Sequence, residues 1–146
     1  MEGGYRLIRL TPTQEQTIRD HGAKDFPHEC CGVMIGDVVE GVKVVRELRP
    51  LSNVHEDGHE RRYLISPEEM RALQFEEMRT KKKILGFYHS HPNHPAQPSV
   101  YDRDWAWPWW TYIIVSVMEG TPELMTSWQL DEDREAFVAE EMVIAE

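Results

Sequence analysis

The chain has 146 residues, of which 40% are hydrophobic and 29% are charged, a composition typical of one globular domain with a single core. Its formal net charge of −10 argues against a nucleic-acid partner, because such a partner requires a basic face. No apolar stretch approaches the roughly 20 residues that a membrane-spanning helix needs, and residues 1–10 lack the apolar block of a secretory signal. We therefore expect one cytoplasmic domain over residues 1–146 that binds neither nucleic acid nor membrane.

The hydrophobic pattern alternates strands with capped helices. The first half of the chain is predicted to begin with an edge strand at 5–10 and a helix at 12–22 ended by Gly22. A strand at 29–35, a turn at Gly36-Asp37, one or two antiparallel strands at 38–48 interrupted at Gly41, and a polar loop at 53–61 follow. The second half predicts a strand at 63–65, a helix at 67–80 with Met70, Leu73 and Met78 inward, strands at 84–91 and 111–118, a short helix at 99–107, and a hairpin of 125–130 and 137–144, whose last segment fits a helix equally well. Strands interleaved with a few helices predict an α/β domain with a central mixed sheet.

Two histidines end the apolar segment 84–88, which has the character of a buried strand. His89 and His91 stand at positions i and i+2, so their side chains point to the same face of that strand. Asp102 follows a short proline-rich loop, just inside a predicted helix, from where it can reach back to both imidazoles. Two histidines and one aspartate with an open fourth position form the ligand set of a catalytic zinc site.

The same residues can also be interpreted without a metal. Ser99 and Asp102 match a helix cap, with a serine N-cap and an acidic residue three positions later. The two histidines and His94 would also suit a polar surface loop. Capping and metal binding are compatible, because a helix N-terminus holds an aspartate carboxylate in place.

Three further groups of residues admit functional interpretations. His55 and His59, in an acidic loop, indicate either a second metal site or, as we favour, a solvated loop. Cys30 and Cys31 are adjacent, which disfavours a disulfide, and we expect them to pack in the core. The aromatic cluster between Trp105 and Tyr112 indicates either a peptide groove or, as we favour, core packing.

Two motifs resemble those of the JAMM (MPN-plus) metallopeptidases. One is His-x-His-Pro, six residues and Ser-x-x-Asp, which here is His89-Ser90-His91-Pro92 followed by Ser99 and Asp102. The other is the family's Pro-x-Glu-x-Cys-Gly stretch, which is similar to Pro27-His28-Glu29-Cys30-Cys31-Gly32. The resemblance implies a three-layered, cytidine-deaminase-like fold, with Zn²⁺ held by His89, His91 and Asp102.

The resemblance also implies two catalytic residues. Glu29 would act as the general base and later protonate the leaving amine. Taken alone, Glu29 would more readily be interpreted as an exposed or salt-bridged glutamate. Ser99 would donate a hydrogen bond to the carbonyl oxygen, where negative charge develops during amide hydrolysis. His94 matches no position of either motif.

Small stand-alone prokaryotic members of that family are associated with ubiquitin-like sulfur-carrier proteins that end in Gly-Gly. The resemblance therefore implies hydrolysis of a peptide or isopeptide bond after such a tail, and no particular oligomeric state. A deubiquitinase-like isopeptidase is an alternative, although the chain has little room for the insertions of such enzymes. A non-catalytic MPN-type scaffold is a second alternative. It is less favoured, because such relatives have usually lost one or more metal ligands and all predicted ligands are present here. A zinc deaminase is excluded, because the chain lacks His-x-Glu and Pro-Cys-x-x-Cys.

Overall fold

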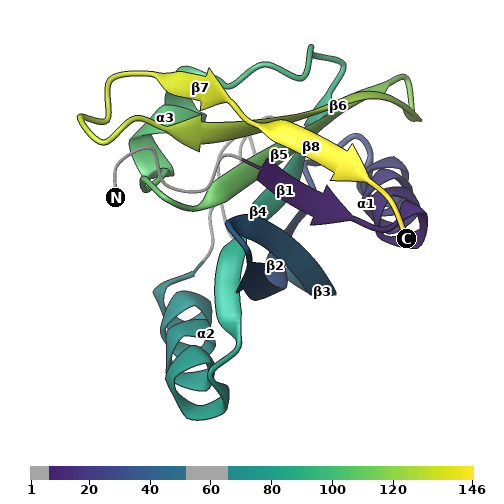
Figure 1. The fold of residues 1–146 in the computed structure, drawn as a ribbon. Coiled ribbons are helices and arrows are strands. Elements are labelled where there is room, and N and C mark those ends of the chain that lie inside the picture. Colours follow the sequence, from purple (N-terminus) through teal and green to yellow (C-terminus); the bar gives the residue numbers. More distant parts are fainter. Residues whose placement is uncertain (1–6, 52–65) are drawn as a thin grey trace.

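The computed structural model describes residues 7–51 and 66–146, and within these ranges eight strands form one sheet (Figure 1). In chain order the elements are β1 (Leu7–Leu10), α1 (Pro12–Asp25), β2 (Cys31–Val39), β3 (Val42–Leu51), α2 (Pro67–Thr80), β4 (Lys83–Pro92), α3 (Val100–Trp105), β5 (Thr111–Met118), β6 (Thr121–Leu130), β7 (Phe137–Ala139) and β8 (Glu141–Ile144). The strand order is β7-β6-β5-β4-β2-β3-β1-β8. The sheet is mixed, because β4 and β5 are parallel whereas β2 is antiparallel to both of its neighbours.

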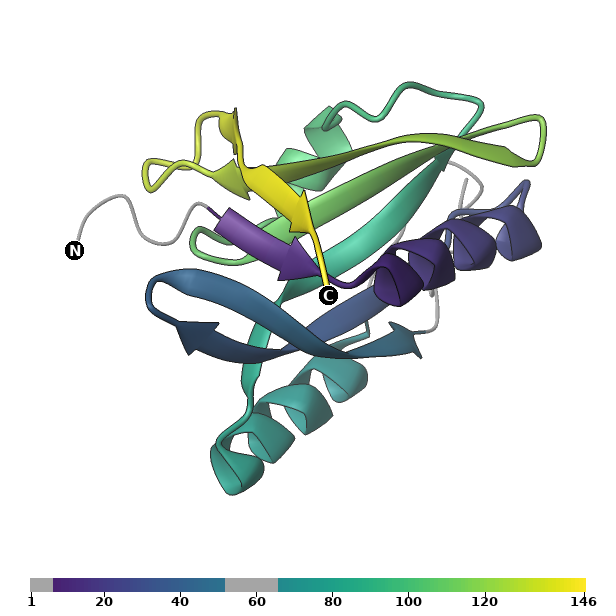
Figure 2. The same ribbon diagram turned by 45° about the vertical axis from the view of Figure 1, so that its right-hand side comes forward.

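Helices cover both faces of this sheet, which gives three layers (Figure 1 and Figure 2). Ile18 of α1 packs in one core with Met34 of β2, and Leu73 of α2 packs in a second core with Val33. Neighbouring residues of β2 thus enter opposite cores, as the alternation of side chains along a strand requires. The predicted α/β fold with a central mixed sheet flanked by helices is confirmed. In the described part of the chain, no helix combines the length and apolar character needed to cross a membrane.

The first helix begins where its sequence predicts and continues beyond the predicted end. Thr11 Oγ1 accepts the Gln14 N–H at 3.1 Å while Gln14 Oε1 accepts the Thr11 N–H at 2.9 Å, which completes a capping box. The predicted stop at Gly22 is wrong, because α1 continues to Asp25. Gly22 instead allows close packing, since a Cβ at this position would lie 3.0 Å from Val117 Cγ2 of β5.

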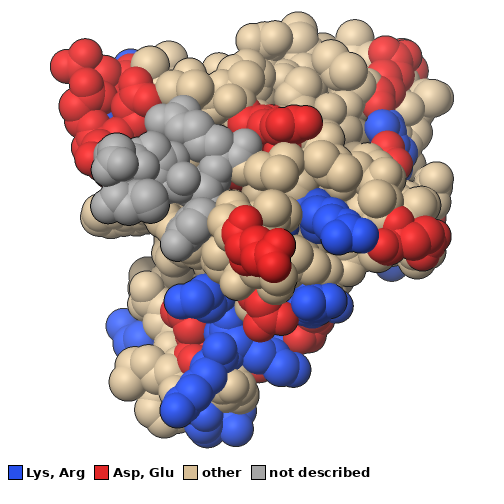
Figure 3. Space-filling model, in the orientation of Figure 1, with Lys and Arg blue, Asp and Glu red and all other residues tan. Residues whose placement is uncertain are grey.

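The second helix is capped by Ser66, whose Oγ accepts the Glu69 N–H at 3.0 Å. Leu73 is buried as predicted, but Met78 is 77% exposed. Met78 follows Leu73 by five positions, which places it about 140° around a helix of 3.6 residues per turn, away from the inward face. Lysines 81–83 are exposed, as predicted for the end of a helix, and Figure 3 shows basic side chains gathered around α2.

Three strand predictions are wrong in detail. No turn interrupts the chain at Gly36-Asp37, because β2 continues through a register shift there, and the turn lies at Glu40-Gly41, where both φ angles are positive. The first strand is not at an edge, since β1 pairs with β3 and with β8. Residues 137–144 form two strands, of which only β7 completes the hairpin with β6. The predicted strand at 63–65 and the loop holding His55 and His59 lie outside the described residues.

A fully buried lysine links strands that are distant in the sequence. Lys43 Nζ on β3 donates to Thr111 Oγ1 at 2.8 Å and to the Trp109 carbonyl oxygen. It also lies 3.9 Å from Glu140 Oε2, in the connection between β7 and β8. Burial lowers the pKa of Lys43 to about 8, although the charge of Glu140 acts in the opposite direction.

This lowered pKa predicts a stability that rises with pH. Between the folded value of about 8 and the ordinary value of 10.5, the unfolded chain binds more protons than the folded chain, so the free energy of unfolding increases with pH. We expect the wild type to gain a few kcal/mol in this window relative to the Lys43→Met variant. Urea unfolding of both proteins at several pH values measures the difference, and a constant difference would contradict the prediction.

Candidate metal centre

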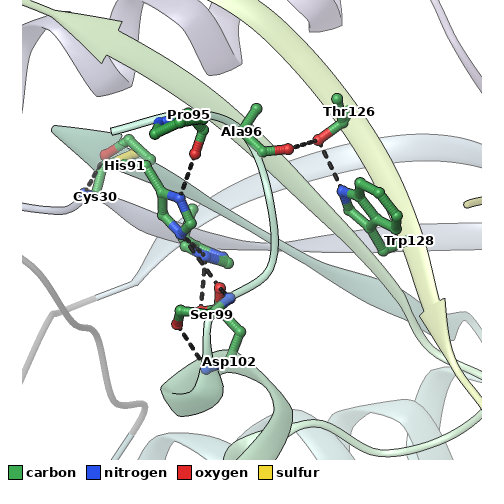
Figure 4. A network of polar contacts seen from close by, with 10 residues as sticks. Cys30, His91, Pro95, Ala96, Ser99, Asp102, Thr126 and Trp128 are labelled. Atoms are coloured by element: carbon green, nitrogen blue, oxygen red, sulfur yellow. Dashed lines mark hydrogen bonds and ion pairs between the residues drawn. The ribbon is translucent and has the colours of Figure 1, made fainter. Parts of the chain in front are cut away.

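Two imidazoles and one carboxylate converge above the carboxyl end of β4. His89 Nε2 lies 3.0 Å from Asp102 Oδ1, and His91 Nε2 lies 3.2 Å from Asp102 Oδ2. The two Nε2 atoms are 3.3 Å apart, and all three groups offer ligand atoms within 4.8 Å of one another. Figure 4 shows His91 and Asp102 pointing toward one another.

The position of β4 in the sheet explains why both histidines are so well buried. The strand lies between β2 and β5, where His89 pairs with Cys31 on one side and with Ile114 on the other. His89 is 0% exposed and His91 is 7% exposed. Alternation along the strand places Ser90 against α1, so the two imidazoles share the face toward α3.

A backbone carbonyl determines which nitrogen of His91 faces the centre. His91 Nδ1 lies 2.8 Å from the Pro95 carbonyl oxygen, which can only accept a hydrogen bond. The Pro95 carbonyl therefore accepts the Nδ1–H of His91, which leaves Nε2 as the ring nitrogen that faces His89 and Asp102. Histidine ligands of metals typically donate their second ring N–H in this way.

The loop that supplies this carbonyl is held by the neighbouring strands. Ser116 Oγ of β5 donates to the His94 carbonyl oxygen, and Thr126 Oγ1 of β6 donates to the Ala96 carbonyl oxygen, both at 2.7 Å. Thr126 Oγ1 in turn accepts the indole N–H of Trp128 at 2.8 Å (Figure 4). The loop is thus fixed by hydrogen bonds from β4, β5 and β6.

Asp102 caps α3 with the same carboxylate that faces the histidines. Ser99 Oγ accepts the Asp102 N–H at 3.1 Å, and Asp102 Oδ2 accepts the Ser99 N–H at 2.7 Å. The sequence predicts that capping and metal binding are compatible, and in this geometry the carboxylate that completes the cap also faces both histidines.

The protonation states suit metal binding. Burial lowers the pKa of His89, although the charge of Asp102 acts in the opposite direction. The lowered pKa favours the neutral imidazole. Burial raises the pKa of Asp102, but its interactions with His89 and His91 outweigh burial and lower that pKa, which favours the ionised carboxylate. Metal ligands must be neutral imidazoles and ionised carboxylates. Two nitrogens and one carboxylate at these distances fit Zn²⁺ with three protein ligands.

Glu29 approaches the centre through the pairing of β2 with β4. Ser90 Oγ accepts the Cys30 N–H at 2.9 Å, and the Ser90 N–H donates to the Cys30 carbonyl oxygen at 3.2 Å. Glu29, immediately before Cys30, is only 2% exposed. Its interpretation as an exposed glutamate is therefore wrong. A cavity of about 270 Å³ is lined by Glu29, His91, His94, Pro95, Gln97, Pro98 and Ser99.

This cavity joins both predicted catalytic residues to one predicted ligand, and also includes His94, to which the motifs give no role. Sequence reasoning missed the Pro95 carbonyl and the hydroxyls of Ser90, Ser116 and Thr126. A carbonyl oxygen occurs in every residue, Ser90 occupies the unspecified position of the His-x-His-Pro motif, and Ser116 and Thr126 lie on strands without a motif, so the sequence does not signal these groups.

The cysteines and tryptophans lie mainly in the cores. Cys30 and Cys31 are buried, and burial raises the pKa of Cys30 to about 12, so its thiol stays protonated. Trp109 packs on the core beneath α1, whereas Trp110 packs on the opposite core. Core packing is thus confirmed for these two tryptophans, while Trp107 is 61% exposed and the side chain of Trp105 lies outside the description.

Comparisons with known proteins agree with this geometry. A family described as prokaryotic homologs of the JAB domain matches residues 12–131. A curated protein of Haloferax volcanii named Desampylase is 37% identical over 126 residues, which cover 84% of this chain and 86% of that protein.

Two solved structures share the fold. A protein of Desulfitobacterium hafniense superimposes with a TM-score of 0.79 at 28% identity, covering 95% of this chain and 93% of its own. A protein of Salinibacter ruber superimposes with a TM-score of 0.70 at 38% identity, covering 93% and 90%. The resemblance predicted from the two motifs is confirmed. The chain belongs to the family of prokaryotic homologs of the JAB domain.

Proposed function

We propose that the protein is a zinc-dependent metallopeptidase that hydrolyses the peptide or isopeptide bond after the C-terminal Gly-Gly of a ubiquitin-like sulfur-carrier protein. The observation that carries this proposal is the convergence of His89, His91 and Asp102 beside a cavity lined by Glu29 and Ser99. The relative from Haloferax volcanii adds support, because the name Desampylase suggests an isopeptidase acting on a ubiquitin-like modifier.

In this proposal three side chains hold the metal. His89 and His91 bind through Nε2, and Asp102 binds through its carboxylate. Zn²⁺ with three protein ligands retains a position for water and lowers the pKa of that water to about 7. Ser99 and the Pro95 carbonyl keep Asp102 and His91 in place through the hydrogen bonds described above.

The remaining chemistry belongs to Glu29 and Ser99. Glu29 accepts a proton from the attacking water and passes it to the amine nitrogen as the amide bond breaks. Ser99 Oγ accepts the Asp102 N–H, which leaves its hydroxyl proton to donate to the carbonyl oxygen of the substrate. Ser99 is not a nucleophile in this proposal, because both nearby histidines on β4 are metal ligands.

A cleavage assay tests this function. The substrate is a ubiquitin-like protein ending in Gly-Gly and extended by a short reporter peptide. We expect mass spectrometry to show cleavage after the second glycine, loss of activity with 1,10-phenanthroline, and recovery with added Zn²⁺. The matched control is 1,7-phenanthroline, which does not chelate. Cleavage elsewhere, or cleavage insensitive to the chelator, would contradict the proposal.

The Ser99→Ala variant is expected to lower kcat by about a hundredfold or more, because removal of one donor to a developing oxyanion has effects of this size. The variant also loses a helix cap, which costs about 1 kcal/mol of stability. Ser66→Ala is the matched control, since the Ser66 side chain likewise accepts a backbone N–H three positions later at the start of α2. Steady-state kinetics and unfolding midpoints of both variants separate the loss of the donor from the loss of a helix cap. Equal kcat values for Ser99→Ala and Ser66→Ala would refute the role of Ser99 as the donor.

A further inference from the structure

Glu29 lies in the connection between α1 and β2, and the residues on both sides of it are hydrogen-bonded through their backbone. The His28 N–H donates to the Asp25 carbonyl oxygen at 2.8 Å. The Cys30 N–H donates to Ser90 Oγ at 2.9 Å. The position of the Glu29 carboxylate therefore depends on how firmly Asp25 and Ser90 are held.

One histidine links Asp25 to β4. His21 Nε2 lies 3.3 Å from Asp25 Oδ2, and His21 Nδ1 lies 2.8 Å from the Tyr88 hydroxyl oxygen. Because a carboxylate can only accept a hydrogen bond, the Nε2–H of a neutral His21 points to Asp25, and Nδ1 accepts the Tyr88 proton. Burial lowers the pKa of His21, although the charge of Asp25 acts in the opposite direction. Burial also raises the pKa of Tyr88, so both groups favour the protonation states that these contacts require.

The Tyr88 ring is itself fixed in the core. Tyr88 is fully buried, and it pairs with Gly32 of β2. A Cβ at Gly32 would lie 2.3 Å from Tyr88 Cε2, so only a residue without a side chain leaves room for this ring. The His21 ring packs edge-on against Tyr88, with centroids 5.7 Å apart. The Pro-x-Glu-x-Cys-Gly stretch thus contains both Glu29 and the glycine that makes room for Tyr88.

Alternation along β4 separates two tasks onto its two faces. His89 and His91 converge with the Asp102 carboxylate on the face toward α3. Tyr88 and Ser90 point to the other face, where α1 packs. The strand that carries the two histidines therefore also holds, from its opposite face, the segment that carries the proposed base.

Helix stability does not account for an aspartate at position 25. Asp25 is the last residue of α1, where the negative end of the helix dipole makes an acidic side chain unfavourable by about 0.3–1 kcal/mol. A role outside the helix is consistent with this placement. The contact of Asp25 with His21, and the backbone bond from His28, supply such a role.

We infer that Tyr88, His21 and Asp25 are positioning residues that, together with Ser90, hold the Glu29 carboxylate in place for proton transfer at the metal centre. This inference rests on the proposed function and adds residues that touch neither metal nor substrate. Misplacement of a reacting group by about 1 Å can cost about a hundredfold in rate. Loss of these contacts should therefore lower kcat while KM and the affinity for Zn²⁺ stay unchanged.

The Asp25→Ala variant tests the chain of contacts at its exposed end. We expect kcat to fall by about tenfold to a hundredfold, with KM and zinc content as in the wild type. Glu15→Ala is the matched control, because Glu15 also pairs with a residue four positions away on α1, at 3.0 Å from Arg19. The control should keep the wild-type kcat. Asp25→Asn should keep most of it, since the amide oxygen still accepts the His21 Nε2–H.

A double-mutant cycle separates positioning of the base from a general structural effect. Tyr88→Phe keeps the buried ring and removes the hydroxyl group, so it should lower kcat about as much as Asp25→Ala does. In the Glu29→Gln background the same change should cause no further loss, because the residue through which it acts is already disabled. An equal loss in both backgrounds would overturn the inference.

Hydrogen–deuterium exchange supplies a readout that does not depend on activity. The backbone amides of residues 26–30 should exchange faster in Asp25→Ala than in Glu15→Ala. Wild-type exchange and wild-type kcat in Asp25→Ala would overturn the inference while leaving the proposed function standing. A wild type that cleaves no substrate after Gly-Gly would overturn the proposed function and, with it, the role of these residues in proton transfer.

Discussion

The Glu29→Gln variant is expected to retain Zn²⁺ and to lose about a thousandfold or more in kcat. Glutamine has nearly the same size, so the 2% exposed position stays filled, but an amide cannot accept the proton that a carboxylate accepts. General acid–base catalysis contributes about 10²–10⁴-fold to reaction rates, and one residue here would serve both proton transfers. Cleavage kinetics and the zinc content of the same preparation measure the two parts of this prediction.

Glu29→Asp provides the chemical control for this experiment. Aspartate keeps the carboxylate but withdraws it by one methylene group, so its kcat should fall between those of the wild type and Glu29→Gln. Normal turnover by Glu29→Gln would show that another group accepts the proton. Loss of zinc from that variant would show that Glu29 belongs to the metal ligands instead.

The Asp102→Asn variant is expected to lose the metal and the activity together. Asparagine Oδ1 can still accept the Ser99 N–H, so the cap of α3 is retained, whereas the negative charge of the ligand is removed. Loss of a residue that only supports a ligand costs about 10–100-fold in metal affinity, and loss of a charged ligand should exceed this range. Competition with a chromophoric chelator measures the affinity for Zn²⁺.

Asp37→Asn is the matched control for this charge removal. Asp37 is exposed on β2 and pairs with Arg46 at 3.0 Å, so its replacement should leave zinc affinity unchanged. An Asp102→Asn variant that binds zinc as tightly as the wild type would remove Asp102 from the ligand set.

The parts of the site that follow from local structure could be predicted from the sequence. His89 and His91 share a face because they are two positions apart on one strand, and Ser99 and Asp102 form a cap because they are three positions apart at a helix start. Both relationships depend on neighbouring residues alone. They are present in the structure as expected.

Long-range relationships could not be derived in this way. The closeness of Glu29 to the histidines depends on the pairing of Cys31 with His89, and only the resemblance to a family indicated it. The return of β8 to pair with β1 depends on strands at opposite ends of the chain. Such pairings follow from how the whole sheet packs, which the hydrophobic pattern of one segment does not contain.

Glycine residues illustrate the same limit. The sequence predicts a helix end at Gly22 and a turn at Gly36, because glycine commonly serves both purposes. In the structure each permits a close approach instead, since a Cβ would lie 3.0 Å from Val117 Cγ2 at Gly22 and 2.0 Å from the Val44 carbonyl oxygen at Gly36. The neighbours that require a glycine lie on other strands, so the pattern of one segment cannot distinguish the two uses.

Anomalous diffraction at the zinc edge, from crystals of the protein purified with Zn²⁺, tests the metal centre itself. We expect one peak per chain, within about 2.0–2.2 Å of His89 Nε2, His91 Nε2 and a carboxylate oxygen of Asp102. A chain that binds no zinc at these three atoms, or that holds zinc only elsewhere, would contradict this expectation.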